Sequence, residues 1–190
     1  GGVCLNWGCI PTKALLKSAQ VFEYINHAAD FGVSVKEPTV DFKGMVKRSR
    51  EVANSNSKGI DFLFKKNKID VIKGHGTLSR GKQVKVTDAD GNKANYEAKN
   101  IILATGGRAR ELPNLPIDGN KVIGYREAMT LSVQPKKMVI VGSGAIGIEF
   151  AYFYNSIGTE VTIVEYLQNI LPLEDTDISL TLARSFKKKG

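Results

Sequence analysis

Cys4 and Cys9 are the only cysteines in the chain, and four residues separate them near its start. Gly8 lets this short segment bend far enough to join two sulfurs, because a disulfide needs its Cα atoms within ~4.4–6.8 Å. Pro11 indicates that a helix begins beside Cys9, and the N–H groups at a helix N-terminus stabilise a thiolate. The pattern therefore favours reversible dithiol–disulfide exchange.

Two other uses of the cysteines are a structural cross-link and half of a zinc site. A loop this short constrains little of the unfolded chain, so the cross-link fits poorly. A four-ligand zinc site would need His27 and His75, which are far apart in sequence and not in ligand spacing. We therefore expect no metal site.

A second motif lies between an apolar strand at residues 136–141 and a helix at residues 145–157. Its residues are Gly142, Ser143, Gly144, Ala145, Ile146 and Gly147. This G-x-G-x-x-G turn, followed by a strand at residues 160–164 and then Glu165, has the context of a dinucleotide-binding fingerprint. The alternatives are a turn that binds nothing and one that binds a flavin.

The glycines predict a tight turn, close approach of a pyrophosphate to the helix N-terminus, and close packing of the helix near Gly147. Glu165 is predicted to accept hydrogen bonds from the ribose 2′-hydroxyl of NAD. Residues 165–169 contain no cation that could meet the 2′-phosphate of NADP. The motif therefore indicates NAD rather than NADP.

The stretch GGVCLNWGCIPTKALL, from Gly1 to Leu16, closely resembles the redox-disulfide motif of the flavoprotein disulfide reductases. Its tail, from Ile10 to Leu16, is most similar to the dihydrolipoamide dehydrogenases in this family. Glutathione and mercuric reductases share the cysteine spacing but tend to differ after the second cysteine. The resemblance extends over essentially the whole chain.

The resemblance implies an FAD site and an NAD site. For FAD it implies Lys13 and the run Ala104, Thr105, Gly106 and Gly107, where the family usually has serine or alanine at the last position. Gly76 is a further expected FAD contact, from its position between the cysteine motif and the Ala104-Thr105-Gly106 turn, although it could equally be a loop glycine. On the NAD side it implies that Glu149 pairs with Lys13.

The implied function is oxidation of protein-bound dihydrolipoamide through Cys4, Cys9 and FAD, with hydride passed to NAD. The implied partner is a lipoyl-bearing acyltransferase of a 2-oxo acid dehydrogenase complex or of a glycine cleavage system, and the intact protein is expected to be a homodimer. A glutathione- or mercuric-type reductase and a non-catalytic nucleotide-binding redox sensor are the alternatives.

The predicted fold is α/β, with parts of two Rossmann-like domains and an antiparallel meander in the first. We expect a partial FAD domain at residues 1–112, a connector at 113–135 and a partial NAD domain at 136–190. Other expected elements are helices at 11–29, from Asp41 onward and at 126–129, a hairpin at 84–98, a strand at 69–73 ending in the turn Gly74-His75-Gly76, and a buried strand at 101–104.

Composition and charge narrow the class of protein further. The chain has 190 residues, 42% of them hydrophobic, and a net charge of +8 from scattered lysines. Scattered charge does not favour a nucleic-acid site, and no apolar run reaches membrane-spanning length. We expect a cytoplasmic protein, or one of the mitochondrial matrix. The chain opens within a motif, so we expect a piece of a longer enzyme that is inactive alone.

Overall fold

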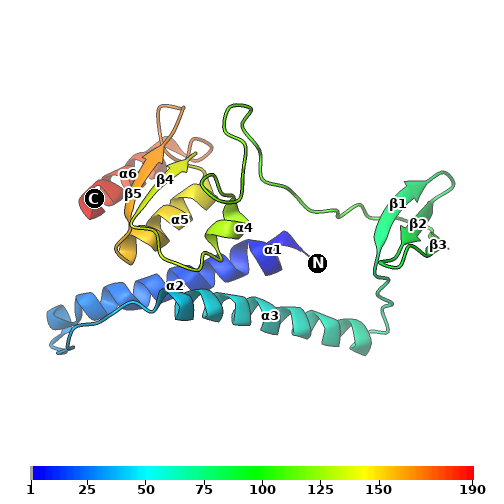
Figure 1. Ribbon diagram of the computed structural model, residues 1–190, viewed down its shortest axis with the longest axis horizontal. Coiled ribbons are helices and arrows are strands. Elements are labelled where there is room, and N and C mark those ends of the chain that lie inside the picture. The colour runs from blue at the N-terminus through cyan, green and yellow to red at the C-terminus, as the bar shows by residue number, and fades with distance from the viewer. Residues whose placement is uncertain (1) are drawn as a thin grey trace. The chain divides into compact units, whose positions relative to one another are not determined.

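The computed structural model describes residues 2–190 and combines helices with parallel and antiparallel strands (Figure 1). The helices are α1 (Val3–Trp7), α2 (Cys9–Asn26), the 3-10 helix η1 (Ala28–Phe31), α3 (Phe42–Lys66), α4 (Tyr125–Ala128), α5 (Ala145–Ser156) and α6 (Thr176–Lys189). The strands are β1 (His75–Ser79), β2 (Gln83–Thr87), β3 (Lys93–Glu97), β4 (Lys137–Val141) and β5 (Glu160–Val164). The predicted α/β class is confirmed. No helix within residues 2–190 is long and apolar enough to cross a membrane.

The chain divides into two compact units. The first contains the residues up to Asn56 together with Arg108–Gly190, and the second is Ser57–Gly107. The first unit therefore includes both the cysteine motif and the G-x-G-x-x-G turn. The division into FAD domain, connector and NAD domain at residues 112 and 136 stays a prediction.

Helix α5 lies at the centre of the first unit, between α2 and the β4–β5 sheet (Figure 1). Its residues Phe153 and Tyr154 are almost completely buried, and their rings meet edge to face with centroids 4.9 Å apart. The Tyr154 hydroxyl donates to the Ala128 carbonyl at 2.5 Å, so the buried polar group is satisfied. The full core cluster is Leu15, Ala19, Phe42, Ala128, Met129, Phe150, Phe153, Tyr154 and Ile157.

Strands β4 and β5 are parallel neighbours joined through α5, which makes a βαβ unit. Val139 pairs with Thr162 in the middle of the ladder, and the two strands align from Lys137 with Glu160 to Val141 with Val164. Both predicted strands and the predicted helix between them are present. The carboxyl ends of β4 and β5 thus lie together, where open α/β sheets place their ligands.

Helix α3 begins as its sequence predicts. The Asp41 carboxylate accepts from the Gly44 N–H at 2.9 Å, which is the hydrogen bond of an N-cap. Phe42 packs into the core against Phe153 and Tyr154. Further along, the Arg48 guanidinium donates to the Ala14 carbonyl at 2.8 Å, which ties α3 to α2.

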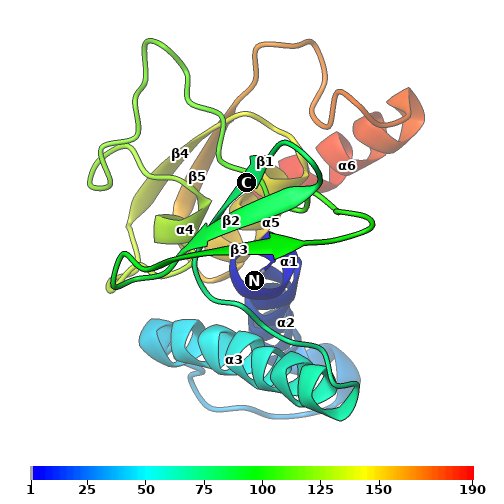
Figure 2. The same cartoon turned by 90° about the vertical axis from the view of Figure 1, so that its right-hand side faces the viewer.

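The second unit contains an antiparallel sheet in the order β1-β2-β3, whose three strands are labelled in Figure 2. Val84 pairs with Tyr96 and Val86 with Ala94, as the alternating pattern predicts. The turn is held by the Asp88 carboxylate, which accepts from the backbone N–H of Asn92 at 2.8 Å. The predicted meander is therefore confirmed.

Two predicted strands and one predicted turn are wrong. Residues 69–73 and 101–104 are not strands, and Ile102 and Leu103 are 89% and 70% exposed. A strand needs a hydrogen-bonding neighbour, and no strand within residues 2–190 pairs with either run. The predicted turn at 74–76 is also displaced, because His75 and Gly76 begin β1 and pair with Thr87 and Val86.

We predict that Phe153→Ala destabilises the protein by ~3–5 kcal/mol, because it leaves a cavity in the aromatic core. Phe31→Ala removes the same atoms from a side chain that is 78% exposed, and should cost well under ~1 kcal/mol. Urea unfolding followed by circular dichroism measures both. Equal losses in the two variants would contradict the assigned core.

Candidate functional site

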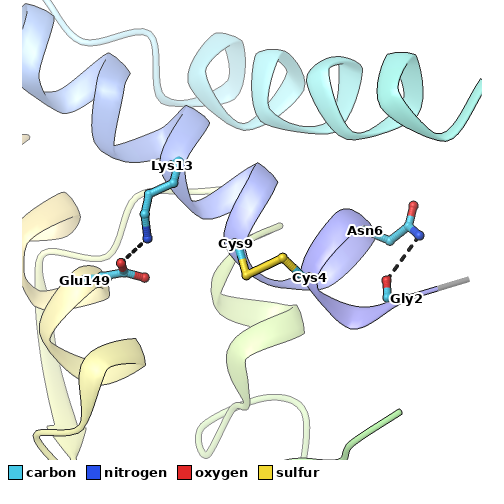
Figure 3. The surroundings of a disulfide bond; sticks show 6 residues. All are labelled: Gly2, Cys4, Asn6, Cys9, Lys13 and Glu149. Carbon is cyan, nitrogen blue, oxygen red and sulfur yellow. Dashed lines mark hydrogen bonds and ion pairs between the residues drawn. A yellow bond between two sulfur atoms is a disulfide. The ribbon is translucent and has the colours of Figure 1, made fainter. Parts of the chain in front are cut away.

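Cys4 and Cys9 form a disulfide with their Cα atoms 4.7 Å apart (Figure 3). Cys4 lies within α1, a five-residue helix that the sequence did not predict, and Cys9 is the first residue of α2. Both cysteines are exposed, so another thiol can approach them. Gly8 precedes α2 and offers no side-chain cap, which leaves the helix N-terminus free to stabilise a Cys9 thiolate.

Lys13 of α2 points toward Glu149 of α5, and the two side chains form an ion pair (Figure 3). This confirms the predicted pairing of residues that are 136 positions apart. A groove of about 340 Å³ opens beside Lys13, lined also by Leu16, Lys17, Gln20 and Tyr152. The ion pair thus joins the cysteine-bearing helix to the helix that follows the glycine turn. A contact of Lys13 with FAD stays a prediction.

The glycine turn has the backbone that its sequence predicts. Gly142 has φ +100°, a conformation that favours glycine, and its N–H donates to the Val164 carbonyl at 2.8 Å. A Cβ on Gly147 would lie 2.2 Å from the Gly142 carbonyl oxygen, so only glycine lets α5 approach the turn this closely. These two positions explain why the motif needs glycine, independently of any ligand.

The N-terminus of α5, where it follows the glycine turn, is exposed. Gly144, Ala145 and Ile146 are exposed, and Gly144 gives α5 no side-chain cap. A Cβ built on Gly144 would meet no atom within 4 Å. An uncapped helix N-terminus with free space in front of it suits an anionic group such as a pyrophosphate.

Glu165 is tied to the glycine turn. Its Oε2 accepts from the Ser143 N–H at 2.8 Å and from the Ser143 hydroxyl at 2.6 Å, while its Oε1 accepts from the Leu167 N–H at 2.9 Å. The hydrogen bonds from the Leu167 backbone and from Ser143 lower the pKa of Glu165 to about 2. The carboxylate therefore stays charged and holds the turn to the end of β5.

The other expected FAD contacts lie in the second unit. Ala104, Thr105, Gly106 and Gly107 are exposed, Gly106 has φ +81°, and a Cβ on Gly107 would meet no atom within 4 Å. This run has open backbone that a large ligand can approach. Gly76 lies within β1, and a Cβ there would be 3.4 Å from the Val84 Cγ1, an ordinary van der Waals contact, so its contact with FAD stays a prediction.

The sequence did not predict two groups of contacts near the site. Arg50 of α3 lies over the ring of Trp7, with 4.2 Å between Cζ and the ring centroid. Glu23 of α2 accepts from the hydroxyls of Tyr152 and Ser156, each at 2.8 Å, and pairs with Lys189. Burial opposes the charged form of Glu23, but the hydrogen bonds outweigh it and lower the pKa of this carboxyl.

Only the second group left a sequence signal. Helix α5 is largely apolar, yet Glu149, Tyr152 and Ser156 recur along it at spacings of three and four residues. Such spacing places polar side chains on one helix face. That face is the one that meets Lys13 and Glu23 of α2.

The sequence pattern of the pyridine nucleotide-disulphide oxidoreductases matches residues 1–190. The chain belongs to this family. Proteins of the family use FAD and a pyridine nucleotide. The first unit contains a disulfide beside a helix N-terminus and a glycine turn followed by an acid. These two motifs correspond to the disulphide and the pyridine nucleotide in the family's name.

The chain is similar to several known proteins of this family. A dihydrolipoyl dehydrogenase of Chlorobaculum parvum is 50% identical over 99% of this chain and 40% of its own length. One from Zymomonas mobilis is 47% identical over 100% of this chain and 41% of its own. A crystal structure of LpdA from Mycobacterium tuberculosis superposes with a TM-score of 0.91 at 29% identity, covering the whole chain and 42% of that structure. The chain therefore spans about two fifths of the length of these proteins.

We predict that Glu165 adds stability in a defined pH range. Its pKa is lowered in the folded protein from an ordinary 4.5 to about 2, so its contribution is complete above pH 4.5 and is lost as the pH falls toward 2. Glu165→Gln should thus lower the urea midpoint at neutral pH and have a smaller effect in acid. A gap that stays constant or widens in acid would contradict the assigned hydrogen bonds.

Proposed function

We propose that the intact protein is a dihydrolipoyl dehydrogenase, which oxidises protein-bound dihydrolipoamide and reduces NAD. The observation that carries the proposal is the Lys13–Glu149 ion pair, which joins the helix of an exposed disulfide to the helix of a dinucleotide-type turn. The similarity to dihydrolipoyl dehydrogenases over the whole chain supports the choice of substrate.

The chemistry at the cysteines follows from their placement. A thiolate of the substrate attacks the Cys4 sulfur, the Cys4–Cys9 bond breaks, and Cys9 leaves as a thiolate beside the N-terminus of α2. The second substrate thiol then displaces Cys4, which closes the substrate disulfide and leaves both cysteines reduced. Two electrons and two protons have thereby moved from the substrate to the protein.

FAD and NAD fit the residues that the proposal assigns to them. Bound FAD would supply the redox chemistry that links a dithiol pair to hydride transfer with NAD. In the first unit, Lys13 would contact FAD. In the second unit, the run at residues 104–107 has exposed backbone that such a ligand could approach. The α5 N-terminus, with Gly142 to Gly147, would hold the pyrophosphate of NAD. Gly76 is a further proposed FAD contact, from its position between the cysteine motif and residues 104–107.

Glu165 retains room for a ribose. A carboxylate offers about four lone-pair positions, and the structure gives Glu165 three hydrogen bonds, two on one oxygen and one on the other. A ribose hydroxyl would share Oε1 with the Leu167 N–H. A 2′-phosphate would instead meet a carboxylate that stays charged, which supports NAD over NADP.

The partner that we propose is a lipoyl-bearing acyltransferase of a 2-oxo acid dehydrogenase complex or of a glycine cleavage system, and the intact protein is proposed to be a homodimer in the cytoplasm or the mitochondrial matrix. Such a partner presents a dithiol on a mobile arm. The two cysteines are exposed, as delivery of a tethered dithiol requires.

The proposal predicts the behaviour of cysteine variants. In the intact protein with FAD, Cys4→Ser and Cys9→Ser should each reduce NAD reduction by dihydrolipoamide about a thousandfold or more, because neither variant can form the disulfide. Absorbance of NADH measures the rate. Turnover of glutathione disulfide with NADPH in place of this reaction would contradict the proposal, and a reactive dithiol without any turnover would indicate a redox sensor.

The role of Glu165 is tested by titrating NADH and NADPH into the intact protein. We expect NADH to bind tighter by about tenfold or more, since the charged carboxylate repels the 2′-phosphate. Glu165→Gln should narrow this difference mainly by improving NADPH binding. Equal affinities in the unaltered protein would contradict the role of Glu165 and leave the cysteine assay unaffected.

A further inference from the structure

We propose that Arg50 is a positioning residue for the Cys4–Cys9 couple, and that it holds the loop between the two cysteines in the geometry of the disulfide. The inference rests on the proposed redox function. Arg50 comes from α3, and its Nη2 donates to the Asn6 carbonyl at 2.6 Å, across 44 positions of sequence. Its guanidinium also stacks on Trp7. Asn6 and Trp7 both lie between the cysteines.

Arg126 of α4 reaches the same ring, with 5.4 Å between its Cζ and the Trp7 centroid. We name Trp7, Arg50 and Arg126 the Trp7 cluster. Figure 3 shows the disulfide with α3 on one side and α4 on the other. Cation–π contacts of this kind are each worth ~0.5–2 kcal/mol, depending on burial. The loop is therefore fixed from two separate elements.

Stability alone does not explain the placement of Arg50. Its Nη1 is buried and has no hydrogen-bond partner within the described residues 2–190. Burying an N–H without a partner costs free energy. The guanidinium nevertheless stays folded against the loop, where its other amino group and its flat face are both used.

The loop needs such support because it has little of its own. Helix α1 has five residues and none is buried. Isolated helices of this length are not stable in water. Contacts to Asn6 and Trp7 reduce the freedom of the loop in the dithiol state, which raises the effective concentration of one thiol at the other and favours the disulfide.

The equilibrium that reports this is exchange with glutathione. The Cys4–Cys9 disulfide and two glutathione thiols give two protein thiols and one glutathione disulfide, so that electrons and protons balance. Loss of Arg50 should shift this reaction toward the protein dithiol. Arg50→Lys separates the effect of charge from that of geometry. Lysine keeps the positive charge but lacks the planar guanidinium, which can stack on a ring and donate hydrogen bonds at the same time.

A matched control is available on the same helix. Arg48 donates to the Ala14 carbonyl at 2.8 Å and to the Ser18 hydroxyl at 3.3 Å, both in α2 and outside the loop. Arg48→Lys makes the same chemical change two positions away. It should weaken the contact between α3 and α2 without changing the disulfide equilibrium.

The experiment equilibrates the full chain with glutathione buffers at neutral pH, traps the free thiols and counts them by mass. We expect Arg50→Lys to make the disulfide about tenfold easier to reduce, which is ~30 mV for a two-electron couple. Trp7→Leu should shift the equilibrium in the same direction, since it removes the surface on which Arg50 stacks. Arg48→Lys should match the unaltered protein.

Trp7 gives a second readout, because it is the only tryptophan of the chain and lies within the disulfide loop. Its fluorescence should change on reduction in the unaltered protein, and the change should be smaller in Arg50→Lys. An unchanged equilibrium in Arg50→Lys, or an equal shift in Arg48→Lys, would overturn the inference while the proposed function stands. Failure of the unaltered couple to cycle would overturn both.

Discussion

The packing of α5 against α2 is the contact on which the first unit depends. Helix α5 buries Phe150, Phe153 and Tyr154 between α2 and the parallel strands, and this aromatic core includes Leu15 and Ala19 of α2. Burial of each large aromatic side chain contributes several kcal/mol, more than any single polar contact in the unit. The cysteine helix and the dinucleotide-type turn are thereby held in one body.

Polar contacts then fix the relative position of α2 and α5 where the two helices pack together. Glu149 meets Lys13 near the N-terminal end of α2, and Tyr152 and Ser156 meet Glu23 two to three turns further along. Apolar packing is not directional, so it leaves the helices free to slide or rotate slightly. Hydrogen bonds to a partly buried carboxylate are directional, and they select one alignment. Lys189 brings α6 to the same carboxylate.

The sequence predicted the elements whose causes are local. Asp41 predicts the start of α3, and the alternating valines predict β2. The glycine turn between two apolar runs predicts β4, α5 and β5. Apolar runs at residues 69–73 and 101–104 were misread, because a strand depends on a neighbour that its own residues do not specify. Helix α1 was missed, since five residues are too few to show a helical period.

In the candidate site, too, the sequence predicts what depends on nearby residues and not what depends on contacts made by folding. Cys4, Cys9 and Glu165 were found because their motifs are contiguous or regularly spaced, and the pairing of Lys13 with Glu149 came from a family resemblance. Arg50 had no signal in the sequence, because it looks like one of several cations on the exposed side of a long helix. Its distinction arises only when α3 folds back beside α1.

Reduction of the disulfide removes one of the two restraints on the loop between the cysteines. The loop buries no residue of its own, so the Trp7 cluster becomes the main restraint that remains. A couple that must accept electrons and then release them cannot have either state greatly favoured, since the favoured state would not react further. Contacts outside the cysteines can adjust this balance in small steps, whereas the covalent geometry of the disulfide cannot. The stacking of two guanidinium groups on one ring supplies such an adjustment without placing a charge on the sulfurs themselves.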